Sequence, residues 1–280
     1  MRGSLSAATD ALAGRGLEPG VPAWIEPGIA CDIPFRGPAG EARAALEDFV
    51  AGVDLVVQSE ANRRKRLLVA DMDSTMISVE CIDELADYAG LKTQVATITK
   101  QAMRGEIDFA EALKARVAIL KGLPENSIDA CYRERVRFTP GARELVATMR
   151  AHGAWTLLVS GGFTAFTDKV AAALGFDEAV ANRLLIDDGA LIGEVAAPIV
   201  DGARKASALG EARQRLGLME SETLAVGDGA NDLAMIEAAG LGVAFRAKPL
   251  LAAAADASIV NGDLGVLLFA QGYARSDWSR

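Results

Sequence analysis

The chain has 280 residues, of which 51% are hydrophobic and 24% charged, as is typical of a globular protein with a sizeable core. Its net charge of −9 argues against a surface for nucleic acid or acidic membranes, and no apolar segment approaches the roughly 18 residues of a membrane-spanning helix. The N-terminus has no signal-peptide pattern, so we expect a cytoplasmic protein with neither nucleic acid nor membrane as a partner.

The cysteines and the single histidine restrict the chemistry. Cys31, Cys81 and Cys131 are scattered without metal-type spacing, so reduced thiols are expected. His152 stands just before a glycine at the end of an expected helix, where a cation complements the helix dipole. This position disfavours histidine phosphatases, Ser-His-Asp hydrolases and His-rich metal sites. We therefore expect any acid–base chemistry to use carboxylates.

The first part of the chain, residues 1–62, has the pattern of a small α+β module. Helical patterns cover 4–13 and 39–50, and apolar runs at 28–35 and 53–57 predict strands. The mixture suggests a reduced ferredoxin-like fold, although its expected first strand is missing and no binding motif is present. We expect the module to serve packing or dimerisation rather than ligand sensing.

The most informative stretch is an apolar run at 66–70 that stops at Asp71 and Asp73. Side chains at i and i+2 of a strand point from the same face, so both carboxylates project from the strand's end. In an open α/β sheet, ligands bind at the carboxyl ends of strands. With Ser74 and Thr75 beside them, the aspartates form half of a site for a hard cation and a phosphate. A strand running into an acidic turn is the alternative.

A helical block follows, with patterns at 78–89, 93–104, 108–121 and 125–136 separated by glycines. Because it interrupts the α/β pattern after the first strand, the block at about 76–138 is predicted to be a helical cap. Arg116 shares a helical face with apolar residues, so its charge either snorkels to solvent or faces an anion. Glu80 falls on the polar face of its helix.

The next segments predict another strand end with polar groups. Thr139 and Pro140 are expected to open a helix as N-cap and first residue. A strand at 155–160 then leads through Ser160, Gly161 and Gly162 into a helix, and amides at a helix N-terminus suit a phosphate. Residues 184–193 have the pattern of a β-hairpin.

The remaining segments complete the predicted sheet. Lys205 lies in the first turn of a helix that runs to about 216, a position that the dipole disfavours and an anion would explain. A strand at 223–227 leads to Asp228 and Asp232, whose oxygens suit Mg²⁺. Further strands at 241–245 and 257–260 predict a doubly wound parallel sheet in the α/β class.

Four motifs in this order resemble those of the haloacid dehalogenase superfamily of aspartate-nucleophile phosphotransferases. They are Asp71-x-Asp73-Ser-Thr75, Ser160-Gly161-Gly162, Lys205 and Gly227-Asp228-Gly229-x-Asn231-Asp232. The resemblance implies a Rossmann-like catalytic domain over 63–280 with the inserted cap. Relatives often carry an amino-acid-sensing ACT domain where residues 1–62 stand here, and a homodimer is compatible with this.

The resemblance also implies the roles of the motif residues. Asp71 would be the nucleophile and Asp73 the general acid and base. Mg²⁺ would be held by Asp71, Asp228 and the backbone carbonyl of Asp73. The phosphoryl oxygens would be bound by Ser160, the amide of Gly161 and Lys205. Asn231 and Asp232 would organise the metal side, with Asn231 near the substrate and Asp232 behind the metal ligands.

Within the superfamily, the cap resembles that of phosphoserine phosphatases, where Glu80, Phe109 and Arg116 match substrate-recognition positions. The resemblance implies that Arg116 binds the substrate carboxylate and Glu80 its ammonium group. The expected reaction is Mg²⁺-dependent hydrolysis of O-phospho-L-serine through an aspartyl-phosphate, the last step of serine biosynthesis. The alternatives are a related phosphotransferase, for example to homoserine, or a phosphatase for another small phosphomonoester. A non-enzymatic amino-acid-binding regulator would require a broken motif, and none is broken.

Overall fold

The centre of the molecule is a parallel β-sheet with helices on both faces, as predicted. The computed structural model describes residues 2–46, 52–103 and 106–279. Within these residues the sheet has six strands in the order β10-β9-β8-β3-β4-β5. The strands are β3 (Leu67–Ala70), β4 (Trp155–Phe163), β5 (Glu178–Asn182), β8 (Thr223–Gly227), β9 (Leu241–Phe245) and β10 (Ala257–Ile259). Since the order runs outward from β3 in both directions, the sheet is doubly wound.

The strands are largely apolar because both faces of the sheet are covered. In β3, Leu68 and Ala70 pack into the larger core cluster, while Leu67 and Val69 pack into a second one across the sheet. The larger cluster contains side chains of α7 (Ala142–Ala151), α8 (Thr164–Leu174) and α12 (Val266–Ala270). The second contains side chains of α9 (Gly202–Arg215), α10 (Leu233–Glu237) and α11 (Pro249–Ala254).

The register of the sheet brings the predicted motifs to one edge. Ala70, the last residue of β3, pairs with Leu158 of β4 and with Val226 of β8. The three neighbouring strands are therefore aligned, and just beyond this level each of them reaches the predicted polar residues. This edge is where ligands bind in open α/β sheets.

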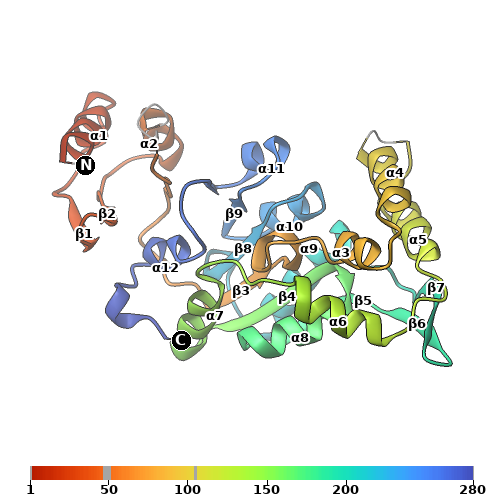
Figure 1. Cartoon of the computed structure of the whole chain (residues 1–280). Coiled ribbons are helices and arrows are strands. Elements are labelled where there is room, and N and C mark those ends of the chain that lie inside the picture. Colours follow the sequence, from red (N-terminus) through yellow and green to blue (C-terminus); the bar gives the residue numbers. More distant parts are fainter. Residues whose placement is uncertain (1, 47–51, 104–105, 280) are drawn as a thin grey trace.

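The predicted cap is present as a helical block. Its helices are α3 (Cys81–Tyr88), α4 (Lys92–Met103), α5 (Phe109–Ile119) and α6 (Asn126–Arg135). Each predicted helix is confirmed to within a few residues, and residue 104 lies outside the described part. Asp108 is the N-cap of α5, and its side chain accepts a hydrogen bond from the Glu111 amide. In Figure 1 the helices α4 and α5 lie at the far end of the molecule from α1 and α2.

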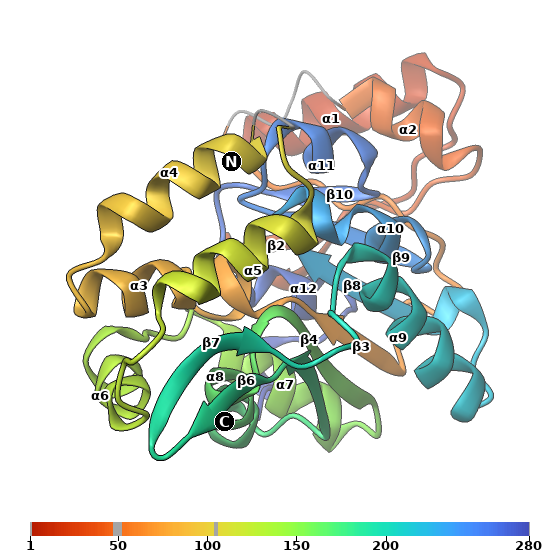
Figure 2. The same ribbon diagram turned by 90° about the vertical axis from the view of Figure 1, so that its right-hand side faces the viewer.

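The predicted hairpin is confirmed as a separate two-stranded sheet of β6 (Leu184–Asp187) and β7 (Ala190–Val195). It projects from the end of β5 and lies against the cap, and Figure 2 shows it directly beneath α5. The chain then returns to the main sheet through α9.

The N-terminal segment consists of α1 (Arg2–Gly14), β1 (Ala23–Glu26), β2 (Ala30–Asp32) and α2 (Ala39–Leu46). The sequence analysis missed β1, which pairs antiparallel with β2. The helix predicted over 39–50 ends at residue 46 in the described part, since 47–51 lie outside it. A small apolar cluster that includes Leu12, Leu17 and Leu46 forms the core of this segment.

The strand predicted at 53–57 is wrong, because only Leu55 forms a bridge, with Ser258 beside β10. The carboxylate of Asp54 instead accepts the amides of Val260 and Gly262 at 2.8 and 2.7 Å. This side-chain contact replaces the backbone ladder that a strand requires. The boundary expected at residue 62 remains a prediction.

The predicted start of α7 is also wrong. The helix begins at Ala142 with Gly141 as its N-cap, so Thr139 and Pro140 precede it. Gly141 has φ +81°, and a Cβ there would lie 2.4 Å from the Gly265 amide nitrogen, so only glycine fits this entry to the helix. At the other end, His152 is the C-cap, as expected, with Nδ1 2.9 Å from the Thr148 carbonyl oxygen. No helix in the described part of the chain is long and apolar enough to cross a membrane.

Candidate active site

A buried ion-pair network lies at the carboxyl edge of the central strands. Lys205, in the first turn of α9, has no exposed surface, and its ammonium group lies 2.5 Å from Asp71 Oδ1 and 2.7 Å from Asp232 Oδ1. Burial disfavours the charged lysine, but the two carboxylates outweigh it and raise the pKa of Lys205. The helix dipole disfavours a lysine at this position, and the two acidic partners explain why it is stable there.

Asp71 directly follows β3 and is also buried. Burial and the charge of Asp232 raise the pKa of Asp71 well above its usual value, while Lys205 opposes this rise. The carboxylate is thus held in place by one short ion pair and is sensitive to any further cation placed beside it.

Asp232 supports this network from behind. Its Oδ1 contacts Lys205, and its Oδ2 accepts the amides of Asp228 and Gly229 at 3.2 and 3.0 Å. Since both oxygens have partners within the protein, Asp232 fixes the lysine and the turn after β8. Such a carboxylate orients its neighbours, and the place behind the metal ligands that the resemblance implies for Asp232 stays a prediction.

Asp73 points to a different part of the site from Asp71. Its Oδ1 accepts the Cys81 amide at 2.9 Å, and its Oδ2 lies 3.3 Å from the Ser160 hydroxyl. Burial, followed by the charge of Glu80, raises the pKa of Asp73 to about 7, against the lowering effect of hydrogen bonds from Cys81. A carboxyl group with this pKa exchanges a proton near neutral pH, as a general acid and base must.

Residues 160–162, called the phosphate loop after the role expected for them from the sequence, lie in the last part of β4, before Phe163. Ser160 is buried, and its hydroxyl oxygen accepts the Gly162 amide at 2.8 Å. Asn182, at the end of β5, donates to the Gly161 carbonyl oxygen at 2.8 Å. The loop is thereby held from both sides, directly before the first turn of α8.

Asn182 is a site residue that the sequence analysis missed. It is 1% exposed and also accepts the Val200 amide at 2.8 Å, so it ties the phosphate loop to the segment before α9. Asparagine is disfavoured in strands, and its place at the end of an apolar run was a signal that could have identified it.

The site contains a cluster of oxygens that could hold a metal ion. Carboxylate oxygens of Asp71, Asp228 and Asp232 lie within 4.8 Å of one another. Burial, followed by the charge of Asp232, raises the pKa of Asp228 to about 6. The Thr75 hydroxyl lies 3.4 Å from Asp228 Oδ1. Hard oxygen donors that repel one another in this way suit a small divalent cation.

The cap brings its predicted residues toward this edge. Phe109 lies against the phosphate loop, with its Cζ 2.9 Å from the position that a Cβ on Gly161 would take. Arg116 is partly buried, which lowers its pKa, while the charges of Asp83, Glu80 and Asp73 oppose the decrease. Its Nε donates to the Ala112 carbonyl oxygen at 3.2 Å.

Glu80 and Asn231 complete the set of predicted residues. Glu80 is exposed at the N-cap of α3 and accepts the Ser74 hydroxyl at 2.7 Å, where Ser74 has φ +56°. Asn231 lies between the β8 turn and the phosphate loop, near Gly229 through its Oδ1 and near Gly161 through its Nδ2. The residues predicted from three strand ends, from the first turn of α9 and from the cap are thus gathered around one edge.

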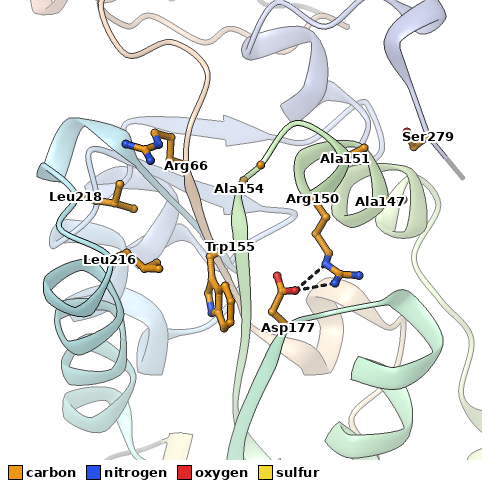
Figure 3. A pocket seen from close by; sticks show the side chains of 11 residues that line it. Arg66, Ala147, Arg150, Ala151, Ala154, Trp155, Asp177, Leu216, Leu218 and Ser279 are labelled. Carbon is orange, nitrogen blue, oxygen red and sulfur yellow. Dashed lines mark hydrogen bonds and ion pairs between the residues drawn. The ribbon is translucent and has the colours of Figure 1, made fainter.

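A different depression, of about 540 Å³, lies at the opposite end of the sheet, between Arg66, which precedes β3, and Trp155, which begins β4. Figure 3 shows its ion pair, in which Arg150 contacts Asp177 at 2.7 Å. Because its charged groups are paired and it lies far from the carboxylates, it is not the predicted site.

The comparisons with known proteins agree with this geometry. Residues 68–237 match the family model of the haloacid dehalogenase-like hydrolases. A phosphoserine phosphatase of Archaeoglobus fulgidus is 47% identical over 81% of this chain and 67% of its own length. One from Albidiferax ferrireducens is 50% identical over 72% of this chain and 88% of its own.

The solved structure of a phospho-aspartyl intermediate analogue of phosphoserine phosphatase is 39% identical, with a TM-score of 0.69. The match covers 74% of this chain and 98% of that one. The chain therefore belongs to the haloacid dehalogenase-like hydrolase family, in its phosphoserine phosphatase branch.

Proposed function

We propose that this protein hydrolyses O-phospho-L-serine to L-serine and phosphate, the last step of serine biosynthesis, with Mg²⁺ as cofactor. The observation that carries the proposal is the division of the site between a phosphate edge and a cap that presents Arg116 and Glu80. A phosphate, a carboxylate and an ammonium group each find a partner of matching chemistry there.

The chemistry begins with Asp71. Its carboxylate oxygen attacks the phosphorus in line, forming an aspartyl-phosphate as the bond to the serine oxygen breaks. Asp73, whose raised pKa of about 7 lets it hold a proton near neutral pH, protonates the leaving oxygen. In the second step Asp73 takes a proton from water, and the water oxygen attacks phosphorus. The bond between phosphorus and the Asp71 oxygen breaks, which frees the Asp71 carboxylate and releases phosphate.

The phosphoryl oxygens are bound by Ser160, the amide of Gly161 and Lys205. Lys205 is already fixed by Asp71 and Asp232, so it is preorganised for the charge that develops during transfer. Asp71, Asp228 and the backbone carbonyl of Asp73 would hold Mg²⁺. When bound, the ion would supply positive charge that offsets the negative charge of the carboxylates and the phosphate.

The cap selects the substrate in this proposal. The Arg116 guanidinium binds the carboxylate, Glu80 binds the ammonium group, and Phe109 covers the phosphate loop. We also propose a cytoplasmic location, in agreement with Cys31, Cys81 and Cys131 all being free thiols.

The proposal is tested by measuring serine and phosphate from O-phospho-L-serine with Mg²⁺, with EDTA, and with homoserine added. We expect equal amounts of serine and phosphate, no product with EDTA, and no change with homoserine. Formation of phosphohomoserine at the expense of free phosphate would instead identify a phosphotransferase.

A further inference from the structure

We propose that the β6–β7 hairpin sets the distance between the phosphate loop and Arg116, and so determines which phosphate esters are accepted. This inference rests on the function proposed above, since it assumes that Arg116 binds the substrate carboxylate. It assigns a role in substrate selectivity to a hairpin that contains none of the predicted site residues.

The base of the hairpin is fixed to the phosphate loop. Asn182 stands two residues before β6, and its side chain binds both the Gly161 carbonyl oxygen and the Val200 amide, each at 2.8 Å. The Ala196 amide donates to the Arg183 carbonyl oxygen at 2.9 Å, which joins the residue after β7 to the residue before β6. One buried amide side chain thus joins the entry and the exit of the hairpin to the loop that receives phosphate.

The tip of the hairpin is fixed to the cap. The Gly122 amide donates to Leu191 at 2.8 Å, and the Leu191 amide donates to Leu123 at 2.9 Å. The Glu125 amide donates to Gly189 at 2.9 Å. All three are bonds between backbone groups, so the turn between α5 and α6 is held to β7 in a defined register.

The hairpin also packs closely along α5. A Cβ on Gly193 would lie 3.0 Å from Lys121 Cβ and 3.3 Å from Ala118 Cα, so the strand approaches the helix as closely as glycine allows. Leu191 is 2% exposed and shares a core cluster with Leu113 and Val117 of α5. Figure 2 shows β7 beneath α5.

The hairpin therefore joins the phosphate loop at one end to the helix of Arg116 at the other. A substrate that carries a phosphate and a carboxylate must reach both, and small misplacements of binding groups cost much of the rate. An ester without a carboxylate needs only the phosphate loop. Moving the hairpin relative to α5 should thus weaken phosphoserine binding and leave hydrolysis of an ester without a carboxylate unchanged.

The test compares Gly193→Ala with Gly189→Ala. Both glycines have positive φ, +83° and +74°, so an alanine strains the backbone at either position. Only at Gly193 does the new methyl group meet α5, whereas nothing lies within 4 Å of a Cβ on Gly189. The difference between the two variants therefore reports the contact with the cap.

We expect Gly193→Ala to raise KM for phosphoserine about tenfold and to leave kcat/KM for p-nitrophenyl phosphate within about twofold. Gly189→Ala should leave both within about twofold. Adding Lys121→Gly to Gly193→Ala removes the nearest atom and should recover much of the lost affinity. Should Gly193→Ala fail to fold, Leu191→Val loosens the same contact, with a smaller loss confined to phosphoserine.

Equal losses for both substrates, or no loss in Gly193→Ala, would overturn the inference. A wild-type protein that releases no serine from phosphoserine would overturn the proposed function itself. An active and selective wild type with an unchanged Gly193→Ala variant would overturn the role of the hairpin alone.

Discussion

The two sides of the site differ in how far they are organised by the protein itself. On the sheet side, Asp71, Lys205 and Asp232 are buried and joined by short ion pairs. On the cap side, Glu80 is exposed, and Arg116 is partly buried with acidic side chains around it. The groups proposed for the chemistry are thus preorganised, whereas the groups proposed for substrate recognition keep donors and acceptors for a ligand.

This difference follows from where the residues stand in the chain. Asp71 and Asp232 follow strands whose register is fixed by a buried core, and Lys205 stands in the first turn of α9, which packs on that sheet, so their positions are precise. The cap-side groups stand on short helices connected to that core by the β6–β7 hairpin and by the turns around the cap. The account therefore predicts that sheet-side changes affect all substrates and that cap-side changes affect only phosphoserine.

The largest effect is expected from Asp71→Asn. Without the carboxylate nucleophile no aspartyl-phosphate can form, so kcat should fall by about 10⁴-fold or more with every substrate. Phosphate release measures the loss, and circular dichroism checks that the fold is retained. Appreciable turnover in a folded variant would remove Asp71 as the nucleophile.

Arg116→Ala tests the cap side. Loss of a charged pair with the carboxylate should raise KM for phosphoserine about 100-fold, while p-nitrophenyl phosphate changes by about twofold at most. Arg116→Lys keeps the charge but cannot form two parallel hydrogen bonds to a carboxylate. Its KM for phosphoserine should lie between the values of the wild type and of Arg116→Ala. Equal losses with both substrates would show that Arg116 does not read the carboxylate.

Ser160→Ala tests the phosphate loop with a smaller change. The hydroxyl both accepts the Gly162 amide and approaches Asp73, so kcat/KM should fall about tenfold for either substrate. Steady-state kinetics with phosphoserine and p-nitrophenyl phosphate measure the two losses. A loss limited to phosphoserine would contradict the claim that changes on the sheet side affect all substrates.

The pKa values predict an unusual pH dependence for the metal-free protein. Burial raises the pKa of Asp228 to about 6 and that of Asp73 to about 7, from an ordinary value of 3.8. The folded state therefore holds these protons more tightly than the unfolded state. This stabilisation is full below about pH 4 and is lost as pH rises through 6 and 7.

Urea unfolding in EDTA should accordingly give a lower free energy of unfolding at pH 8 than at pH 5, and Mg²⁺ should restore stability at pH 8. Asp228→Asn should reduce the dependence, because it removes one of the carboxylates whose pKa is raised in the folded protein. A metal-free protein that becomes more stable between pH 5 and 8 would contradict the assignment of these two carboxylates.

The smallest effect is expected from removing residues 1–46. This cut spares Asp54, which binds the loop at 260–262, and Gln58, whose side chain donates to the Ala270 carbonyl oxygen at 2.7 Å. Activity with both substrates should stay within about twofold, measured beside the full chain at equal concentration. Loss of activity in a folded truncation would mean that the N-terminal segment helps to build the site.

The sheet could be predicted because its signals are local. An apolar run that stops at Asp71 or Asp228 indicates both a strand and the polar residues at its end. A short apolar run of this kind is typical of a buried parallel strand. The cap helices were equally clear from their glycine breaks. The strand expected at 53–57 failed because Asp54 uses its side chain for a contact 206 residues away, which no local pattern shows.

The site could be predicted only in part for the same reason. The sequence marks Lys205 as unusual because its charge opposes the helix dipole. The two carboxylates that explain its position follow β3 and β8, which are far from Lys205 in the sequence. Glu80 has an ordinary place on a polar helical face, so only the family resemblance identified it. Asn182 carries a local signal as an asparagine at the end of an apolar run, but its partners Gly161 and Val200 and the hairpin contacts depend on tertiary packing, which the sequence pattern does not show.

The most direct test of this account is the ratio of kcat/KM for O-phospho-L-serine to that for phosphoethanolamine, which lacks only the carboxylate. We predict a ratio of about 100 or more in the wild-type protein with Mg²⁺, from the charged hydrogen bonds to Arg116. A ratio near one would contradict the claim that the cap selects the substrate while the sheet edge performs the chemistry.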